Sequence, residues 1–258
     1  MGANQKEERL GITKENKRGE LMKIIKYNSC SDILVEFQDE HKAQVKTNYA
    51  SFEKKSVKNP YYPSVFGVGK PGNKYPCKIK NKYTKEYRAW QNMLGRCFKK
   101  SYDTYDDVTC CDEWLLYDNF YEWLHSQENF DKWLNGDNWC LDKDILIKGN
   151  KIYSPDTCCL VSFDVNVLFV KRNKMRGDLP IGVHYDYTSS KIYAASCHLN
   201  NGKSKKIGRY NTPKEAFDAY KEFKENLIKK IAEEEFKQGN ISKYCYEAMM
   251  HYQVEITD

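Results

Sequence analysis

Residues 141–158 combine charged side chains with two turn signals. Their sequence is LDKDILIKGNKIYSPDTC, in which Asp142 stands directly beside Lys143. Gly149-Asn150 is typical of a tight turn, and residues 153–156, Tyr-Ser-Pro-Asp, are typical of a fixed loop. A carboxylate in such a hairpin can hold a divalent cation, or it can accept backbone N–H groups in a turn. The residues fit both interpretations.

The neighbours of Lys143 make it a poor general base. An unperturbed lysine has a pKa of about 10.4 and is almost fully protonated at neutral pH. Asp142 and Asp144 flank Lys143 and favour its charged form. A histidine would suit proton abstraction better, but the five histidines lie elsewhere, at positions 41, 125, 184, 198 and 251. We therefore expect little or no hydrolysis from this segment.

The distribution of charge is the second functional pattern. Residues 171–230 contain 14 Lys or Arg and 6 Asp or Glu, a net charge of +8, whereas the whole chain has a net charge of +6. The other residues therefore sum to −2. A basic segment on a near-neutral body predicts a nucleic-acid partner. The alternative is a solvated, lysine-rich surface.

Helical spacing predicts two helices ahead of residues 141–158. Residues 83–100 begin with Thr84 as a potential cap, and their apolar face consists of Tyr87, Trp90, Met93, Leu94 and Cys97. Residues 111–127 carry an apolar stripe of Trp114, Leu115, Phe120 and Trp123. Residues 159–170, which follow the hairpin, fit either a strand or a helix by composition.

Three strands and a long helix are predicted within the basic segment. The strands cover residues 181–185, 191–197 and 205–208. Thr212-Pro213-Lys214-Glu215 forms a capping box with Pro at the first helical position. One face of the helix that follows is apolar and consists of Ala216, Phe217, Tyr220, Phe223, Leu227 and Ile231.

A helix on one side of this sheet would leave the other side open to a ligand, and strands can enter the major groove of DNA. Alternation places Tyr185, Tyr187, Lys191 and Tyr193 on one face, which Lys203, Lys205 and Arg209 continue. We expect the lysines, Lys206 included, to contact phosphates and Arg209 to contact a guanine.

Residues 87–170 resemble the HNH-type endonuclease domain of phage proteins. The resemblance rests on Trp90, Met93, Arg96-Cys97, Cys111–Trp114, Asn119-Phe120, Trp123, Leu141–Ile145, Gly149-Asn150, Tyr153–Asp156 and Leu160-Val161. It implies a ββα-containing centre with one divalent metal, Mg²⁺, held by Asp142 and Asn166. Family members have a catalytic histidine where this chain has Lys143, and an Asn where it has Thr157. Asp142 and Lys143 are thus the candidate catalytic residues of a degenerate domain.

Residues 181–228 resemble an AP2-type DNA-binding domain. The matching positions are Gly182-Val183, Lys191–Ala194, Lys206–Gly208, Tyr210–Thr212, Glu215-Ala216 and Ala219-Tyr220. The resemblance implies a three-stranded antiparallel sheet packed on one helix, with double-stranded DNA as partner. The tryptophans of the plant members are absent, and Ile192 and Ile207 stand in their place. Plant target sequences therefore do not carry over.

We expect an α+β chain of several modules. They are a flexible arm (1–20), a small β module (21–66), a degenerate HNH-like domain (76–170), an AP2-like domain (178–235) and a C-terminal tail (236–258). The first 66 residues include three predicted strands, at 22–27, 33–37 and 44–47, and residues 10–66 resemble a β module that often precedes such phage domains. The Pro- and Gly-rich segment 58–76 marks the boundary after it.

The ten cysteines predict buried, reduced thiols rather than a zinc site. None lies in a CxxC motif, and two pairs are adjacent, at 110–111 and 158–159. No apolar run near residue 1 resembles a signal peptide, and no stretch of about 20 apolar residues could span a membrane. We expect a cytoplasmic protein of a bacterial host cell, without a membrane partner.

Three functions fit these patterns. The first is a phage or prophage protein that binds double-stranded DNA without cutting it. The second is a homing-type nicking endonuclease in which Asp142 and Asn166 hold Mg²⁺. The third is an inhibitor whose partner is a host defence protein or another phage protein.

Overall fold

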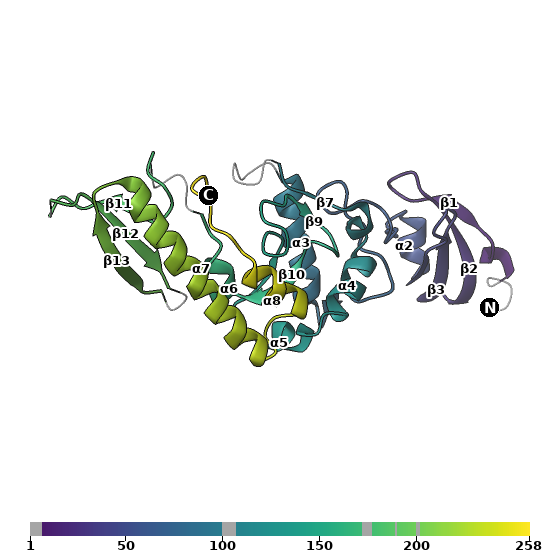
Figure 1. The fold of residues 1–258 in the computed structure, drawn as a ribbon. Helices are drawn as coiled ribbons and strands as arrows, with labels where there is room; N and C mark the ends of the chain where they lie inside the picture. The colour runs from purple at the N-terminus through teal and green to yellow at the C-terminus, as the bar shows by residue number, and fades with distance from the viewer. Residues whose placement is uncertain (1–6, 100–106, 172–176, 189, 200–201) are drawn as a thin grey trace. The chain divides into compact units, whose positions relative to one another are not determined.

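The computed structural model describes residues 7–99, 107–171, 177–188, 190–199 and 202–258. These residues form an α+β protein with several small sheets, which confirms the predicted fold class. The chain divides into two compact units, one of residues 1–106 with 112–122 and the other of residues 107–111 with 123–258 (Figure 1). The predicted module boundaries do not coincide with these units, because the proposed central module contributes residues to both.

The first unit contains a four-stranded antiparallel sheet, β1-β2-β3-β4 (Thr13–Glu15, Leu21–Ser29, Asp32–Phe37, Gln44–Thr47). Alternate residues of β2 and β3 are buried, and helix α2 (Tyr49–Glu53) adds Phe52 to the same core. The three predicted strands are confirmed. The flexible arm is wrong for residues 13–15, because β1 pairs with β2 and Ile12 packs against the core.

Helix α3 (Lys85–Phe98) and the residues around it complete this unit. The Thr84 hydroxyl accepts the Tyr87 N–H at 3.1 Å, as predicted for the N-cap, and a short hairpin, β5-β6 (Lys78–Ile79, Lys82–Tyr83), precedes it. Trp90 is fully buried, and its indole N–H donates to the Trp114 carbonyl at 2.7 Å. The predicted helix 111–127 is divided into a 3₁₀ turn, η2 (Asp112–Leu115), and helix α4 (Tyr117–His125).

Asp118 on α4 fixes the Pro- and Gly-rich segment. Its carboxylate accepts the backbone N–H groups of residues 73, 74 and 75 at 3.3–3.4 Å. Gly72 has φ +70°, and a Cβ at this position would lie 2.2 Å from an Asp118 carboxylate oxygen. The segment is therefore an ordered loop that requires glycine at position 72.

The second unit contains a ββα segment. Strand β8 (Trp139–Asp142) pairs antiparallel with β10 (Cys159–Ser162), and helix α6 (Phe163–Val167) follows with Ser162 as its N-cap. Between the two strands, β9 (Ile152–Tyr153) pairs in parallel with β7 (Thr109–Cys110) instead. The sequence predicted a hairpin closed by Gly149-Asn150. The structure has a longer connection, 143–158, whose ladder closes at Asp142 and Cys159.

The same unit holds the predicted three-stranded sheet. Its strands are β11 (Val183–Tyr185), β12 (Tyr193–His198) and β13 (Ser204–Tyr210), paired antiparallel in chain order. Helix α7 (Pro213–Lys237) covers one face, and its N-terminus has the predicted capping box. Gly182 has φ +79° and leaves no room for a Cβ, which would lie 2.1 Å from Tyr220 on α7.

Helix α7 continues past the sheet and enters a second core. Its residues Ile228, Ile231 and Ala232 pack with Val161 and Val165 of the ββα segment, and with Cys245 and Met249 of helix α8 (Lys243–Met250). The prediction of a tail from residue 236 is therefore wrong. The apolar stripe of α7 extends beyond the sheet, and α8 covers it. Although α7 has 25 residues, no helix in the described parts of the chain has the length and apolar character needed to cross a membrane.

Asn129, just before helix α5 (Phe130–Asn135), links segments that are distant in the sequence. Its side chain is buried, and Nδ2 donates to the carbonyls of Leu160 on β10 and Asn240 between α7 and α8, both at 2.8 Å. One amide group thus supplies a donor to two carbonyls, that of buried Leu160 and that of half-buried Asn240.

We predict that Asn129→Ala lowers the free energy of unfolding by about 1–3 kcal/mol, because it leaves two shielded carbonyls without a donor. Asn135→Ala is the matched control, since this exposed amide donates only to a carbonyl of its own helix. Denaturant titration measures both. Equal stability of the two variants would show that the Asn129 contacts contribute little.

Candidate functional site

Asp142, the predicted metal ligand and catalytic residue, serves as a turn cap. It ends β8 and is 8% exposed. Its Oδ1 accepts the N–H groups of Asp144 at 2.7 Å and Ile145 at 2.8 Å. Burial raises the pKa of Asp142 above its ordinary value, and the two N–H donors partly offset that effect. These contacts match the structural interpretation of this residue.

Lys143 lies in an arrangement that suits a charged ammonium. Its side chain is 7% exposed, and Nζ donates to Oδ1 of Asp144 at 2.7 Å and to the carbonyl of Asn150 at 3.0 Å. A general base must present a free lone pair to water, whereas this nitrogen faces two acceptors. The geometry agrees with the prediction that Lys143 is a poor base.

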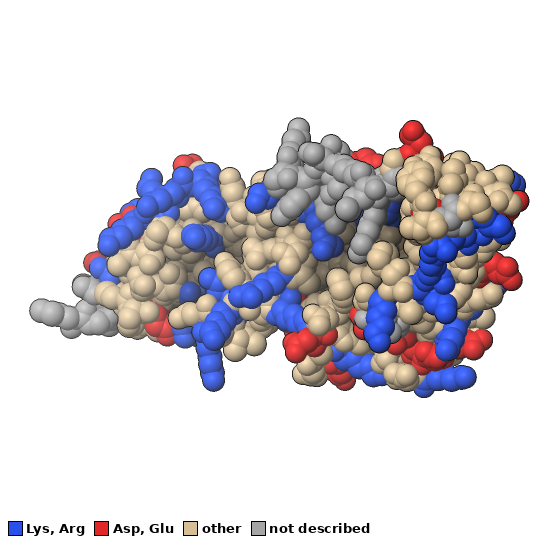
Figure 2. Space-filling model, turned by 90° about the vertical axis from the view of Figure 1, so that its left-hand side faces the viewer, with Lys and Arg blue, Asp and Glu red and all other residues tan. Residues whose placement is uncertain are grey.

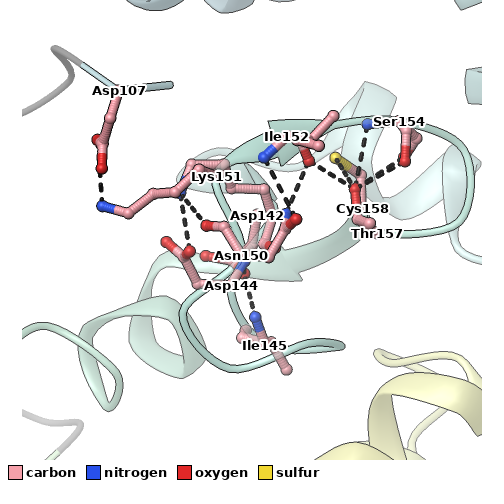
Figure 3. A network of polar contacts seen from close by, with 11 residues as sticks. Asp107, Asp142, Asp144, Ile145, Asn150, Lys151, Ile152, Ser154, Thr157 and Cys158 are labelled. Carbon is pink, nitrogen blue, oxygen red and sulfur yellow. Dashed lines mark hydrogen bonds and ion pairs between the residues drawn. The ribbon is translucent and has the colours of Figure 1, made fainter. Parts of the chain in front are cut away.

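The connection 143–158 is held by its own side chains (Figure 3). The Asn150 amide donates to the carbonyls of Lys143 and Ile152 at 2.8 and 2.7 Å. The Thr157 hydroxyl donates to the Ile152 carbonyl at 2.7 Å and accepts the Ser154 N–H at 3.1 Å. Thr157, which replaces the Asn of the HNH-type pattern, thus contributes to the structure of the loop.

The second predicted metal ligand, Asn166, lies on α6, which packs against β8 and β10. The described residues show no hydrogen bond between Asp142 and Asn166, and they contain no group of three His, Cys, Asp or Glu side chains arranged to hold a metal ion. Oδ1 of Asp142, the predicted metal ligand, already accepts two amides.

The surface beside this connection is acidic. A pocket of about 980 Å³ lies next to Pro155 and is lined by Glu128, Asp156 and Glu247, with no Lys or Arg among its lining residues. Clustered carboxylates repel a phosphate backbone. The ββα segment therefore offers poor electrostatics for nucleic acid on this side.

The described residues contain no disulfide, so the ten cysteines are thiols. Cys158, Cys159, Cys197 and Cys245 are buried, as predicted for the whole set, but the other six are partly or fully exposed. Burial raises the pKa of Cys158 to about 12, so this thiol next to the candidate site is a weak nucleophile.

The pairing of β11, β12 and β13 corrects the predicted arrangement of the DNA-binding residues. Tyr185 and Tyr193 stand opposite each other, in the same alternation as Val183 and Ala195, which contact α7. Ala194 stands opposite Arg209, so Arg209 lies on the other face. The prediction that the tyrosines and Arg209 share one face is wrong.

A bulge in β13 lies between Lys206 and Arg209. The register shifts after Ala195, so that Ser196 stands opposite Lys206 and Cys197 opposite Lys205. Lys206 and Arg209 consequently share the face that α7 does not cover, which we call the open face; it also carries His184, Ala194, Ser196 and His198. Lys205 points from the edge strand toward the side of buried Cys197 and is exposed, as are Lys191 and Lys203.

Asp186, which the sequence analysis missed, organises the two cations of the open face. Its Oδ2 accepts Lys206 Nζ at 2.7 Å, Arg209 Nε at 2.9 Å and Arg209 Nη2 at 2.8 Å. The Lys206 ammonium, together with Thr188 and Arg209, holds the pKa of Asp186 well below its ordinary range. Because Asp186 alternates with Tyr185 and Tyr187, the sequence predicts that its carboxylate lies on the face opposite the tyrosines. The structure places Arg209 on that same face.

These contacts leave Arg209 with one unused edge. Nε and Nη2 bind Asp186, and Nη2 also donates to Thr188 Oγ1 at 2.7 Å, which leaves Nη1 for a ligand. The predicted bidentate contact with guanine requires two nitrogens on one edge, so on the Nη1–Nη2 edge it would displace the Thr188 hydroxyl. A phosphate oxygen can be bound by Nη1 alone.

The tyrosines form a stacked group at the end of the sheet. The Tyr185 and Tyr187 rings lie 5.6 Å apart with an interplanar angle of 10°, and they are 50% and 76% exposed. Tyr193 lies 5.6 Å from Tyr185. Figure 2 shows Lys and Arg side chains in several groups across the face in view, separated by uncharged side chains.

No known family model, curated protein or solved structure matches this chain. The HNH-type and AP2-type resemblances therefore stay predictions, and the site is interpreted from its own geometry.

Two substitutions at Asp142 separate a turn cap from a metal ligand. We predict that Asp142→Ala lowers the free energy of unfolding by about 1–3 kcal/mol, since two amides lose their acceptor. Asp142→Asn retains an acceptor and removes a buried charge, so it should equal or exceed the wild type at pH 7.

The pH dependence has a definite sign. Because the folded-state pKa of Asp142 is raised, its contribution to stability is fully present below the ordinary Asp pKa of about 3.9 and is lost as pH rises through the folded-state value. The advantage of Asp142→Asn should therefore grow from about pH 4 upward in denaturant titrations. A variant less stable than the wild type at pH 7 would show that the carboxylate charge itself is needed.

Proposed function

We propose that this chain binds double-stranded DNA through the open face of the sheet β11-β12-β13, and that the ββα segment is a framework rather than a hydrolytic site. The observation that carries the proposal is the pair of cations, Lys206 and Arg209, which Asp186 holds on the face that α7 leaves uncovered.

The open face suits a close approach by a polyanion. Its cations lie on β13, opposite Ala194, which is buried, and Ser196, which is half-buried. Asp186, Lys206 and Arg209 together retain one net positive charge. Because Asp186 already orients both cations, little side-chain freedom is lost when a phosphate binds.

The contacts favour binding to the DNA backbone over reading of bases. Lys206 and the free Nη1 of Arg209 can each bind one phosphate oxygen, and Lys205 extends the positive charge along the edge strand. Phosphate contacts fix the position of a protein on DNA but carry no sequence information. We therefore expect affinity that depends strongly on salt and weakly on sequence.

The ββα segment fits a supporting role. Asp142 binds two amides and Lys143 binds Asp144 and the Asn150 carbonyl, so each predicted catalytic group has a structural partner. A nicking endonuclease would require Asp142 to release those amides before it could bind Mg²⁺. Binding without cutting requires no such rearrangement.

We predict that Lys206→Ala combined with Arg209→Ala weakens binding of a DNA duplex by roughly tenfold or more at low salt and reduces the slope of log Kd against log salt by about 1.8, the value for two lost phosphate contacts. Fluorescence anisotropy at several salt concentrations measures both quantities.

The matched control is Lys80→Ala combined with Lys82→Ala, which removes two exposed lysines from the first unit. It should retain wild-type affinity. Equal losses in both double variants would indicate general electrostatic attraction, and no loss in either would refute the sheet interface. Supercoiled plasmid should stay intact with Mg²⁺ or Mn²⁺; nicking that disappears in Asp142→Ala would contradict the framework role.

A further inference from the structure

A pocket of about 520 Å³ lies where β11 stops covering β12. Strand β11 pairs with β12 only as far as Ala195. One further backbone hydrogen bond follows, in which the Ser196 N–H donates to the Gly182 carbonyl at 2.9 Å. Beyond it, residues 197–198 have no β11 neighbour. The opening is lined by Ser196 and His198 of β12, Tyr220 and Lys224 of α7, and residues that precede β11.

Lys224 is buried in this pocket without a partner. The residue is 7% exposed, yet the described residues give its Nζ neither a hydrogen-bond acceptor nor a carboxylate within ion-pair distance. Lys143 is buried to the same degree but has Asp144 and the Asn150 carbonyl. At Lys143, therefore, the buried ammonium has hydrogen-bond acceptors, which the ammonium of Lys224 lacks among the described residues.

Burial of an uncompensated charge destabilises a folded protein. Burial lowers the pKa of Lys224, which reports the same unfavourable environment. A methionine would fill this space without that penalty. A ligand with negative charge would supply the missing partner.

We propose that this pocket binds a small organic carboxylate, with its charged group on Lys224. Val170, Ile181 and Val183 line the pocket and supply apolar surface for the rest of the ligand. The inference does not depend on DNA binding.

The remaining charges of the lining favour a single negative charge on the ligand. Lys171 already pairs with Asp258 at 2.7 Å, and Asp178 is the one acidic side chain among the lining residues. A dianion would meet Asp178 with only Lys224 to compensate, whereas a carboxylate matches one ammonium.

The test uses benzoate as the anionic probe, benzyl alcohol as its neutral analogue and phenyl phosphate as the dianion, with saturation-transfer NMR and titration calorimetry on the full chain. Wild type should bind benzoate saturably, and Lys224→Met should bind it about tenfold more weakly or worse, because a hydrogen bond to a charged group is lost. Lys230→Met, an exposed lysine of the same helix paired with Glu234, should bind as wild type does.

Thermal unfolding gives an independent readout. Without ligand, Lys224→Met should unfold at a higher temperature than the wild type. Benzoate should raise the unfolding temperature of the wild type and of Lys230→Met, but not that of Lys224→Met. The inference is overturned if Lys224→Met keeps its benzoate affinity, if benzyl alcohol binds as tightly as benzoate, or if benzoate shows no saturable binding. Tighter binding of phenyl phosphate would overturn the assignment to a carboxylate.

Discussion

The packing of helix α7 is the constraint on which the second unit depends. The N-terminal part of α7 covers the sheet through Ala216, Phe217 and Tyr220, and its C-terminal part enters the core of the ββα segment. A sheet of three short strands has only one face to bury and is marginal alone. Because one helix serves both cores, a change in either core acts on the other, and the open face of the sheet is supported by residues far from it (Figure 1).

Most of the shielded charged groups of this unit have partners; among the described residues, Lys224 and Oε2 of Glu235 are exceptions. Asp142 and Lys143 have their partners within a few residues, and Asp186 has its partners on β13; these contacts favour a structural role for a pattern that looks catalytic. Buried polar groups must be paired, so local pairing removes them from chemistry. Lys224 has no polar partner among the described residues, and a buried ammonium beside a cavity is the feature that points to a ligand.

Sequence patterns predicted the helices and strands, whereas the arrangement of the site residues depends on tertiary contacts. The capping box at Thr212–Glu215 and the alternation of β2 and β3 could be recognised because each depends on neighbours in the sequence. The face on which Lys206 and Arg209 lie could not be predicted from the sequence, because a bulge inserts one residue into β13. The bulge places positions three apart on the same side of the strand. Likewise, the role of α8 depends on the core that α7 presents to it, which no pattern within residues 236–258 encodes.

The central claim, that the open face of the sheet binds DNA while the ββα segment does not, is tested most directly by NMR chemical-shift mapping during titration with a short duplex. The account predicts shifts in the backbone amides of residues 183–186 and 204–210 and in the Nε–H of Arg209, with the amides of residues 143–158 unchanged. Shifts confined to residues 143–158, or no chemical-shift changes in the sheet at saturating DNA, would contradict it.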